Sequence, residues 1–68
     1  MEKINIAILG YGVIGKGVFE ICNNMPNINV LKIFDRKEKF DNNHIELFTD
    51  NANDIFKDDN IQLIVEVL

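Results

Sequence analysis

Residues 4–17 read INIAILGYGVIGKG, in which a mostly apolar run leads directly into the glycine pattern G-x-G-x-x-G formed by Gly10, Gly12 and Gly15. A helical pattern of apolar residues follows at once, so we expect a strand, a glycine turn and a helix in that order. This order is the context in which the pattern indicates a dinucleotide site. The first glycine allows a sharp turn, the second leaves room for a pyrophosphate, and the third lets the helix pack closely on the strand.

An acidic residue stands where such a site needs one. Asp35 follows the second apolar run, Ile28–Phe34, and lies twenty positions after Gly15. A carboxylate there can accept hydrogen bonds from the hydroxyls of an adenosine ribose. Asp35 favours a free 2′-hydroxyl, whereas Arg36 and Lys37 could pair with a 2′-phosphate, so these residues leave both NAD and NADP open. The alternative is that the glycines serve only packing and that Asp35 opens a turn.

The apolar pattern of the whole chain predicts an α/β protein with elements in the order β-α-β-β-α-β. Strands are expected at Lys3–Leu9, Ile28–Phe34, Ile45–Phe48 and Ile61–Leu68, and helices at Val13–Asn24 and Asn51–Lys57. The polar segment Asp35–His44 is expected to be a loop. The buried helix faces are expected at Ile14, Val18, Ile21 and Met25 and at Ile55 and Phe56, with Thr49 or Asp50 capping the second helix.

This order of elements is typical of a doubly wound parallel sheet of Rossmann type with the strand order 3-2-1-4. The last strand would then lie beside the first, and ligands bind at that switch point, outside the carboxyl ends of the strands. Residues 61–68 resemble a buried strand that ends with the chain. We therefore expect residues 1–68 to be the amino-terminal part of a dinucleotide-binding domain, cut after its fourth strand and lacking a substrate domain. An unpaired apolar edge there predicts a homo-oligomer.

Composition limits the classes of function. The chain has 68 residues, a net charge of −4 and a single cysteine, and it suffices for one small domain. It has no large basic cluster, which argues against a nucleic-acid surface. No apolar run approaches the roughly 20 residues of a membrane span. Because one cysteine cannot form an internal disulfide, we expect a reducing, cytoplasmic setting.

Few other side chains suggest chemistry. Cys22 falls on the expected inner side of the first helix and is predicted to be a small buried hydrophobe. His44 has no ligand-type residues at metal-binding spacing and is expected to be exposed. Glu66 interrupts an apolar strand near the expected cleft, where it either faces outward or serves the site. The sequence nominates no catalytic acid, base or nucleophile and no metal site.

Two parts of the chain resemble the amino-terminal segment of homoserine dehydrogenase. Residues 6–18, IAILGYGVIGKGV, are similar to the opening of that family, including an extra glycine two residues after the fingerprint. Residues 47–50, LFTD, and 58–68, DDNIQLIVEVL, are similar to the family's threonine-aspartate helix cap and to its valine-glutamate strand, which normally continues into a pair of glycines. The resemblance spans nearly the whole chain, apart from the unspecific loop at 35–44.

The resemblance implies a reversible hydride transfer between NAD(P)H and aspartate semialdehyde, which gives homoserine on the route to threonine and methionine. By position it assigns Gly10, Gly12, Val13, Ile14 and Gly15 to the pyrophosphate and Asp35 and Arg36 to the adenosine ribose. With the neighbouring Tyr11 and Lys37, these residues form the predicted cofactor-binding set. The catalytic lysines and acid of the family lie in a later domain and match nothing here, so this chain alone is expected to be inactive.

Two further points stay open. Many members of the family carry Arg before the acid of the second strand, whereas this chain has Phe34 there and Arg36 after Asp35, so NADP or NAD is the expected cofactor without a choice between them. The chain could also belong to another small dehydrogenase, of the glucose-fructose oxidoreductase or aspartate dehydrogenase type. Outside the enzymes, the alternatives are a non-catalytic nucleotide-sensing module and a structural fragment whose glycines only pack.

Overall fold

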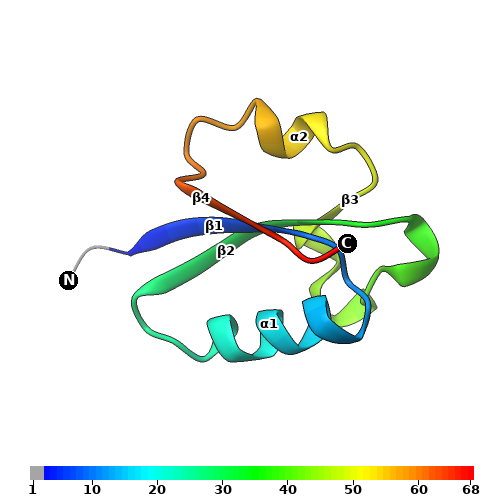
Figure 1. The fold of residues 1–68 in the computed structure, drawn as a ribbon, viewed down its shortest axis with the longest axis horizontal. Helices are drawn as coiled ribbons and strands as arrows, with labels where there is room; N and C mark the ends of the chain where they lie inside the picture. The colour runs from blue at the N-terminus through cyan, green and yellow to red at the C-terminus, as the bar shows by residue number, and fades with distance from the viewer. Residues whose placement is uncertain (1–2) are drawn as a thin grey trace.

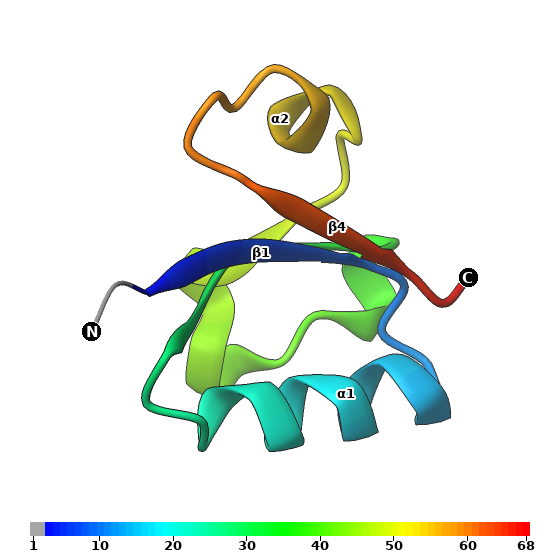
Figure 2. The ribbon, with the colours of Figure 1, turned by 60° about the vertical axis from the view of Figure 1, so that its left-hand side comes forward.

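Four parallel strands form one sheet in the computed structural model, which describes residues 3–68 (Figure 1). The strands are β1 (Ile4–Leu9), β2 (Ile28–Phe34), β3 (Phe48–Thr49) and β4 (Leu63–Glu66). Their order across the sheet is β3-β2-β1-β4, as expected. Helix α1 (Val13–Asn23) covers one face and helix α2 (Asn53–Phe56) the other, as Figures 1 and 2 show. The chain is therefore an α/β protein whose sheet is compatible with a partial Rossmann-like fold.

Strand β1 divides the core between the two faces of the sheet. Ile6 and Ile8 are buried on the α1 side, in a cluster with Phe19 of that helix. Ala7 and Leu9 are buried in a second cluster on the α2 side. Because successive strand side chains point to opposite faces, a strand covered on both sides needs apolar residues at every position. The four residues meet this need, and β1 lies inside the sheet.

Strand β2 contains one irregularity that decides which of its side chains are buried. Its pairing with β1 skips Leu31, which has no partner there, and resumes at Ala7 and Lys32. Such a bulge shifts the alternation of side chains by one residue. Val30 and Ile33, three positions apart, are consequently both buried in the cluster on the α1 side. Lys32 falls on the opposite face.

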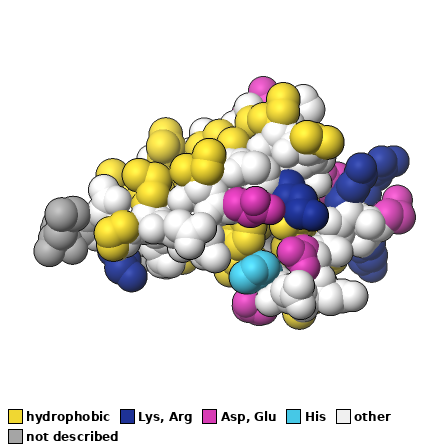
Figure 3. All heavy atoms as spheres, turned by 90° about the horizontal axis from the view of Figure 1, so that it is seen from below, with side chains coloured by type: hydrophobic (Ala, Val, Ile, Leu, Met, Phe, Trp, Pro, Cys, Tyr) yellow, Lys and Arg dark blue, Asp and Glu magenta, His cyan; other side chains and the backbone are white. Residues whose placement is uncertain are grey.

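Helix α1 turns a different side to the sheet from the one that its apolar spacing predicts. The buried or half-buried residues are Gly15, Gly17, Val18, Phe19 and Cys22. The prediction was wrong for Ile14, Ile21 and Met25, which are exposed together with Val13. The backbone at Gly15 lies against the glycine turn, and this close approach, rather than the apolar stripe, sets the rotation of the helix. Figure 3 views the α1 side and shows a band of hydrophobic side chains on it.

The connection between β2 and β3 is more regular than predicted. The expected loop contains a short 3₁₀ helix, η1 (Lys37–Lys39). A second one, η2 (Asn42–Leu47), occupies most of the expected strand Ile45–Phe48, which was therefore wrong except at its last residue. The physical reason is a cap, because Asp41 Oδ1 accepts the Asn43 N–H at 2.9 Å and starts a helical turn. Only two residues remain to form β3.

Helix α2 is a single turn, shorter than predicted, and its cap differs from the expected ones. Ala52 occupies the N-cap position and makes no side-chain cap bond. Asn51, the residue before this N-cap, instead accepts the Asn53 N–H on its Oδ1 at 3.0 Å. Ile55 is buried as predicted, but Phe56 is 61% exposed, since one turn presents a single residue to the sheet.

The other bounds differ less from the prediction. The ends of β1, β2 and α1 agree with it to within one residue, while β4 is shorter than the predicted strand at 61–68. Within residues 3–68, none of the helices combines the length and apolar character that crossing a bilayer requires.

Candidate functional site

The carboxyl ends of the strands meet at one edge of the sheet. Leu9 pairs with Phe34 on one side and with Glu66 on the other, and Phe34 pairs with Thr49. The segments that follow these strands are therefore neighbours, among them the glycine turn after β1 and Asp35 after β2. In parallel α/β sheets, ligands bind at this edge.

Two glycines of the turn are required by the packing of the protein itself. Gly10 has a φ of +112°, a backbone conformation that side chains disfavour, and a Cβ there would lie 2.9 Å from the carbonyl oxygen of Val67. A Cβ on Gly15 would lie 1.9 Å from the carbonyl oxygen of Gly10. Glycine at these two positions allows β1, β4 and α1 to come close together. The packing of the protein therefore accounts for both glycines without a ligand.

Gly12 is different, because nothing in the protein occupies the space beside it. A Cβ at this position would meet no atom within 4 Å. Gly12 is also the N-cap residue of α1, which has no side-chain cap and no acidic residue in its first turn. Among residues 3–68, no group accepts a hydrogen bond from the N–H groups of Gly12, Val13 or Ile14. The start of the helix is therefore open to an anion, which its N–H groups and its dipole favour.

Asp35 is held in place by the backbone on both sides of its carboxylate. Its Oδ2 accepts the Tyr11 N–H at 2.7 Å, and its Oδ1 accepts the Arg36 N–H at 2.7 Å. The first bond joins the end of β2 to the middle of the glycine turn. The second fixes the rotation of the carboxylate. Asp35 thus adjoins the open start of α1 with a defined orientation.

Tyr11 was predicted as part of the cofactor-binding set, and its side chain lies inside the protein. It is buried between Phe19 and Phe48, whose ring centroids lie 6.1 and 4.8 Å from its own. Its hydroxyl donates to Asp41 Oδ2 at 3.2 Å. Burial, and then the bond to Asp41, raise the pKa of Tyr11 to about 12. Because its N–H is already bonded to Asp35, Tyr11 holds the turn rather than offering a polar group to a ligand.

A surface pocket of about 350 Å³ opens beside Asp35. It is lined by Phe34, Asp35, Arg36, Lys37, Glu38 and Asp50. Lys37 and Asp50 face each other across it, with Lys37 Nζ 3.9 Å from Asp50 Oδ2. The pocket thus brings together three predicted site residues, Asp35, Arg36 and Lys37, with Asp50 from the end of β3, and Asp35 links it to the glycine turn.

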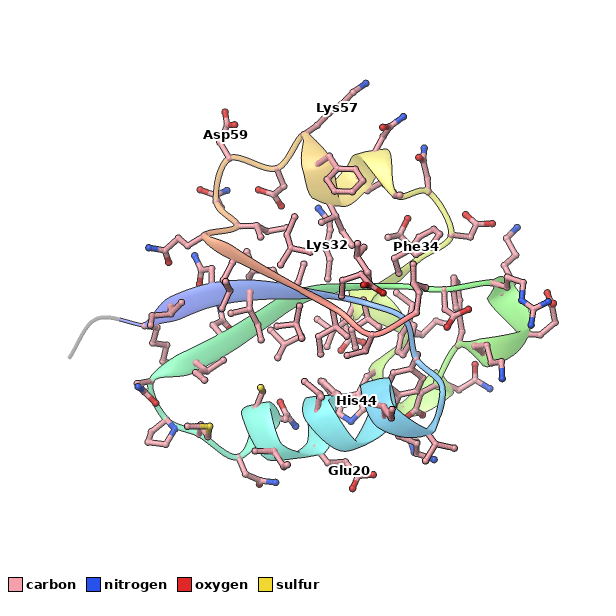
Figure 4. All side chains as sticks on the ribbon, viewed as in Figure 1. Glu20, Lys32, Phe34, His44, Lys57 and Asp59 are labelled. Atoms are coloured by element: carbon pink, nitrogen blue, oxygen red, sulfur yellow. The ribbon has the colours of Figure 1, made fainter. Side chains whose placement is uncertain are left out.

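Three residues considered in the sequence lie elsewhere or play other roles. His44 is half-buried, with its ring 4.9 Å from that of Phe19, because η2 carries it onto α1; the prediction that it is exposed was wrong. Figure 4 shows His44 on the α1 side of the sheet. Cys22 packs against the same cluster, as predicted. Glu66 is exposed, and its Oε2 accepts the Leu68 N–H at 2.7 Å.

Sequence reasoning missed an ion pair on the other face of the sheet. Lys32 Nζ lies 3.0 Å from Asp58 Oδ2. Figure 4 shows that the side chains of Lys32 and Phe34 both lie on the α2 side of the sheet. The Asn60 N–H, and then Lys32, hold the pKa of Asp58 below its usual value. The available signal for this ion pair was a lysine inside a mostly apolar strand. The role of Asp50 had no such signal, because it depends on how β3 pairs with β2.

Comparisons with protein-family models, with curated proteins and with solved structures found no match. Among residues 3–68 there is no group of three or more His, Cys, Asp or Glu residues that could hold a metal ion. The geometry of the turn and of the pocket is therefore what bears on function.

Proposed function

We propose that this chain binds a nicotinamide dinucleotide, NAD or NADP, at the carboxyl edge of its sheet. The pyrophosphate would lie over Gly12 against the N–H groups that begin α1, and the adenosine ribose would bond to Asp35. The observation that carries the proposal is the unfilled space at Gly12 beside a helix start without a cap. That space adjoins the pocket at Asp35 through the bond from the Tyr11 N–H.

Packing alone gives a reason for only part of the glycine pattern. Gly10 and Gly15 are explained by close backbone contacts, so they support the structural alternative as well as the dinucleotide hypothesis. Gly12 has no such contact, and a helix N-cap more often carries Ser, Thr, Asp or Asn. A side chain is missing where a capping group would be expected, and a bound pyrophosphate would supply the missing acceptor.

We further propose that the whole protein is an oxidoreductase of the homoserine dehydrogenase type. This part of the proposal rests on the sequence resemblance at residues 6–18, 47–50 and 58–68. Bound NAD(P)H would supply the hydride that reduces aspartate semialdehyde to homoserine. The residues of this chain would bind and orient the cofactor, and none of them is assigned an acid-base role. A non-catalytic nucleotide-sensing module would bind the dinucleotide with the same residues. An oxidoreductase and a sensor would therefore differ in enzymatic activity and not in this binding site.

A titration followed by amide chemical shifts tests the dinucleotide site. The ¹⁵N-labelled protein is titrated with NADH and, separately, with NADPH. We expect the largest shifts at Gly10–Gly17 and Asp35–Lys37 and small shifts at the far end of α1, around Asn23. Shifts spread evenly over the chain, or none at millimolar ligand, would contradict the proposal. An activity assay then separates the oxidoreductase from the sensor. In the whole protein, absorbance is used to monitor the oxidation of NADPH or NADH by aspartate semialdehyde.

A further inference from the structure

We propose that Asp50, together with Asp35, makes the pocket select against a 2′-phosphate, so that the protein prefers NAD(H) to NADP(H). This inference rests on the proposed dinucleotide site and adds a specificity-determining residue to it. Asp50 lies fifteen positions beyond Asp35 in the sequence and reaches the pocket only because β3 pairs with β2.

The charges of the pocket favour a hydroxyl over a phosphate. Its lining holds three carboxylates, Asp35, Glu38 and Asp50, and only two cations, Arg36 and Lys37. A phosphomonoester carries a charge of about −1.5 to −2 at neutral pH, so it meets a net negative lining. A ribose hydroxyl is neutral and can donate to a carboxylate without that repulsion.

One of the two cations is already opposed by a carboxylate. Lys37 Nζ lies 3.9 Å from Asp50 Oδ2, with side-chain exposures of 76% and 51%. The described residues include no ion-pair partner for Arg36. A 2′-phosphate would therefore find one unopposed guanidinium, and its attraction to Lys37 would be offset by Asp50 at close range. The pair is exposed, so its influence is moderate and depends on salt.

Asp50 offers a cleaner test than Asp35. The carboxylate of Asp35 accepts two backbone N–H groups, and its replacement would disturb the glycine turn. No hydrogen bond of the described residues uses the Asp50 side chain, whose one polar contact is the loose pair with Lys37. Asp50→Asn therefore removes a charge from the pocket and keeps the shape of the side chain. Asp59→Asn is the matched control, since Asp59 projects into solvent beyond α2, as Figure 4 shows.

The experiment measures the dissociation constants of NADH and NADPH by calorimetry for the natural protein and for both variants at low salt. We expect the natural protein to bind NADH more tightly. Asp50→Asn should tighten NADPH binding about two- to fivefold and change NADH binding less than about twofold, an effect that weakens as salt is added. Asp59→Asn should leave the ratio of the two constants unchanged.

The outcomes separate this inference from the proposed function. If neither dinucleotide binds, the dinucleotide site itself is wrong, and the selectivity falls with it. If both bind and NADPH is as tight as NADH in the natural protein, only the selectivity is overturned. An unchanged ratio in Asp50→Asn, or the same change in Asp59→Asn, would overturn the role of Asp50.

Discussion

The glycines of the turn divide into two kinds, although the sequence pattern treats them alike. Gly10 and Gly15 lie where a Cβ would collide with backbone atoms, at 2.9 and 1.9 Å. Gly12 and Gly17 lie where a Cβ would meet nothing within 4 Å. The first kind is required for the fold, and the second is not. Packing therefore does not explain Gly12, which stands at the start of α1 where we propose that a pyrophosphate binds.

The largest expected effect is at Gly15, where the contact is closest. In Gly15→Ala the new Cβ cannot avoid the carbonyl of Gly10 unless β1 and α1 move apart. We expect a loss of about 3 kcal/mol or more in the free energy of unfolding, enough to unfold much of a domain this small. Urea unfolding followed by circular dichroism measures it. A variant as stable as the natural protein would show that this contact does not hold the helix against the turn.

Gly10→Ala should cost less but still destabilise the fold. The φ of +112° is unfavourable for alanine, and the Cβ would press on the carbonyl of Val67. A loss of about 1 to 3 kcal/mol in unfolding free energy is expected, because β4 can shift slightly to relieve the contact. The same urea experiment reports it, and the ranking of Gly15 above Gly10 is the result that matters.

Removing the hydroxyl of Tyr11 should have a smaller effect on stability than either Gly15→Ala or Gly10→Ala. Tyr11→Phe removes the hydroxyl that donates to Asp41 and keeps the packed ring, so we expect a loss of about 0.5 to 1.5 kcal/mol. Tyr11 is the single tyrosine, which allows its ionisation to be followed by ultraviolet absorbance. The raised pKa predicts a midpoint near 12. Since the folded state holds the proton more tightly, stability is unaffected below pH about 10 and falls as the pH rises toward 12. A midpoint near 10 in the folded protein would contradict the buried hydrogen bond.

Gly12→Ser should separate stability from binding. The serine fits the open space and can cap α1, so the unfolding free energy should change by less than about 1 kcal/mol, in the stabilising direction. Affinity for NADH should fall about tenfold or more, because the side chain would occupy the place that we propose for the pyrophosphate. Calorimetry and urea unfolding of the same sample test both. Undiminished binding would remove the main support for the proposed site.

Gly17→Ala is the matched control for that variant and the smallest change. It also adds a Cβ in open space, but inside α1 and away from its start. Alanine favours a helix over glycine by about 0.5 to 1 kcal/mol, so a small gain in stability is expected, with NADH affinity unchanged. Reduced binding in Gly17→Ala would mean that any added side-chain atom on α1 disturbs NADH binding. The effect of Gly12→Ser would then no longer support a pyrophosphate site at Gly12.

Much of the fold could be predicted because its signals are local. The apolar runs before Gly10 and before Asp35 define β1 and β2, and the order of the elements predicts the strand order. The rotation of α1 could not be predicted from its own spacing, since the contact between Gly15 and Gly10 decides it. An apolar stripe shows which face of a helix can be buried. It does not show which face packs against the sheet, because that depends on contacts with the neighbouring segments.

The candidate site divides in the same way. The adjacency of the turn and Asp35 follows from the parallel pairing of two predicted strands. The position of Asp50 depends on where η2 ends and β3 begins, and the sequence predicted that boundary wrongly. The half-buried position of His44 has the same origin. Contacts between distant segments, rather than residue types, determine these parts.

The unpaired Leu31 bears on how relatives of this chain should be aligned. Strand β2 uses seven residues to cover the length that β1 covers with six, so the count from Gly15 to Asp35 contains one residue that adds no distance. A homologue without the bulge would carry its acid one position nearer to its glycines and still place it at the same point in space. A search pattern with a fixed interval would reject that homologue, and the gap in a correct alignment belongs at Leu31.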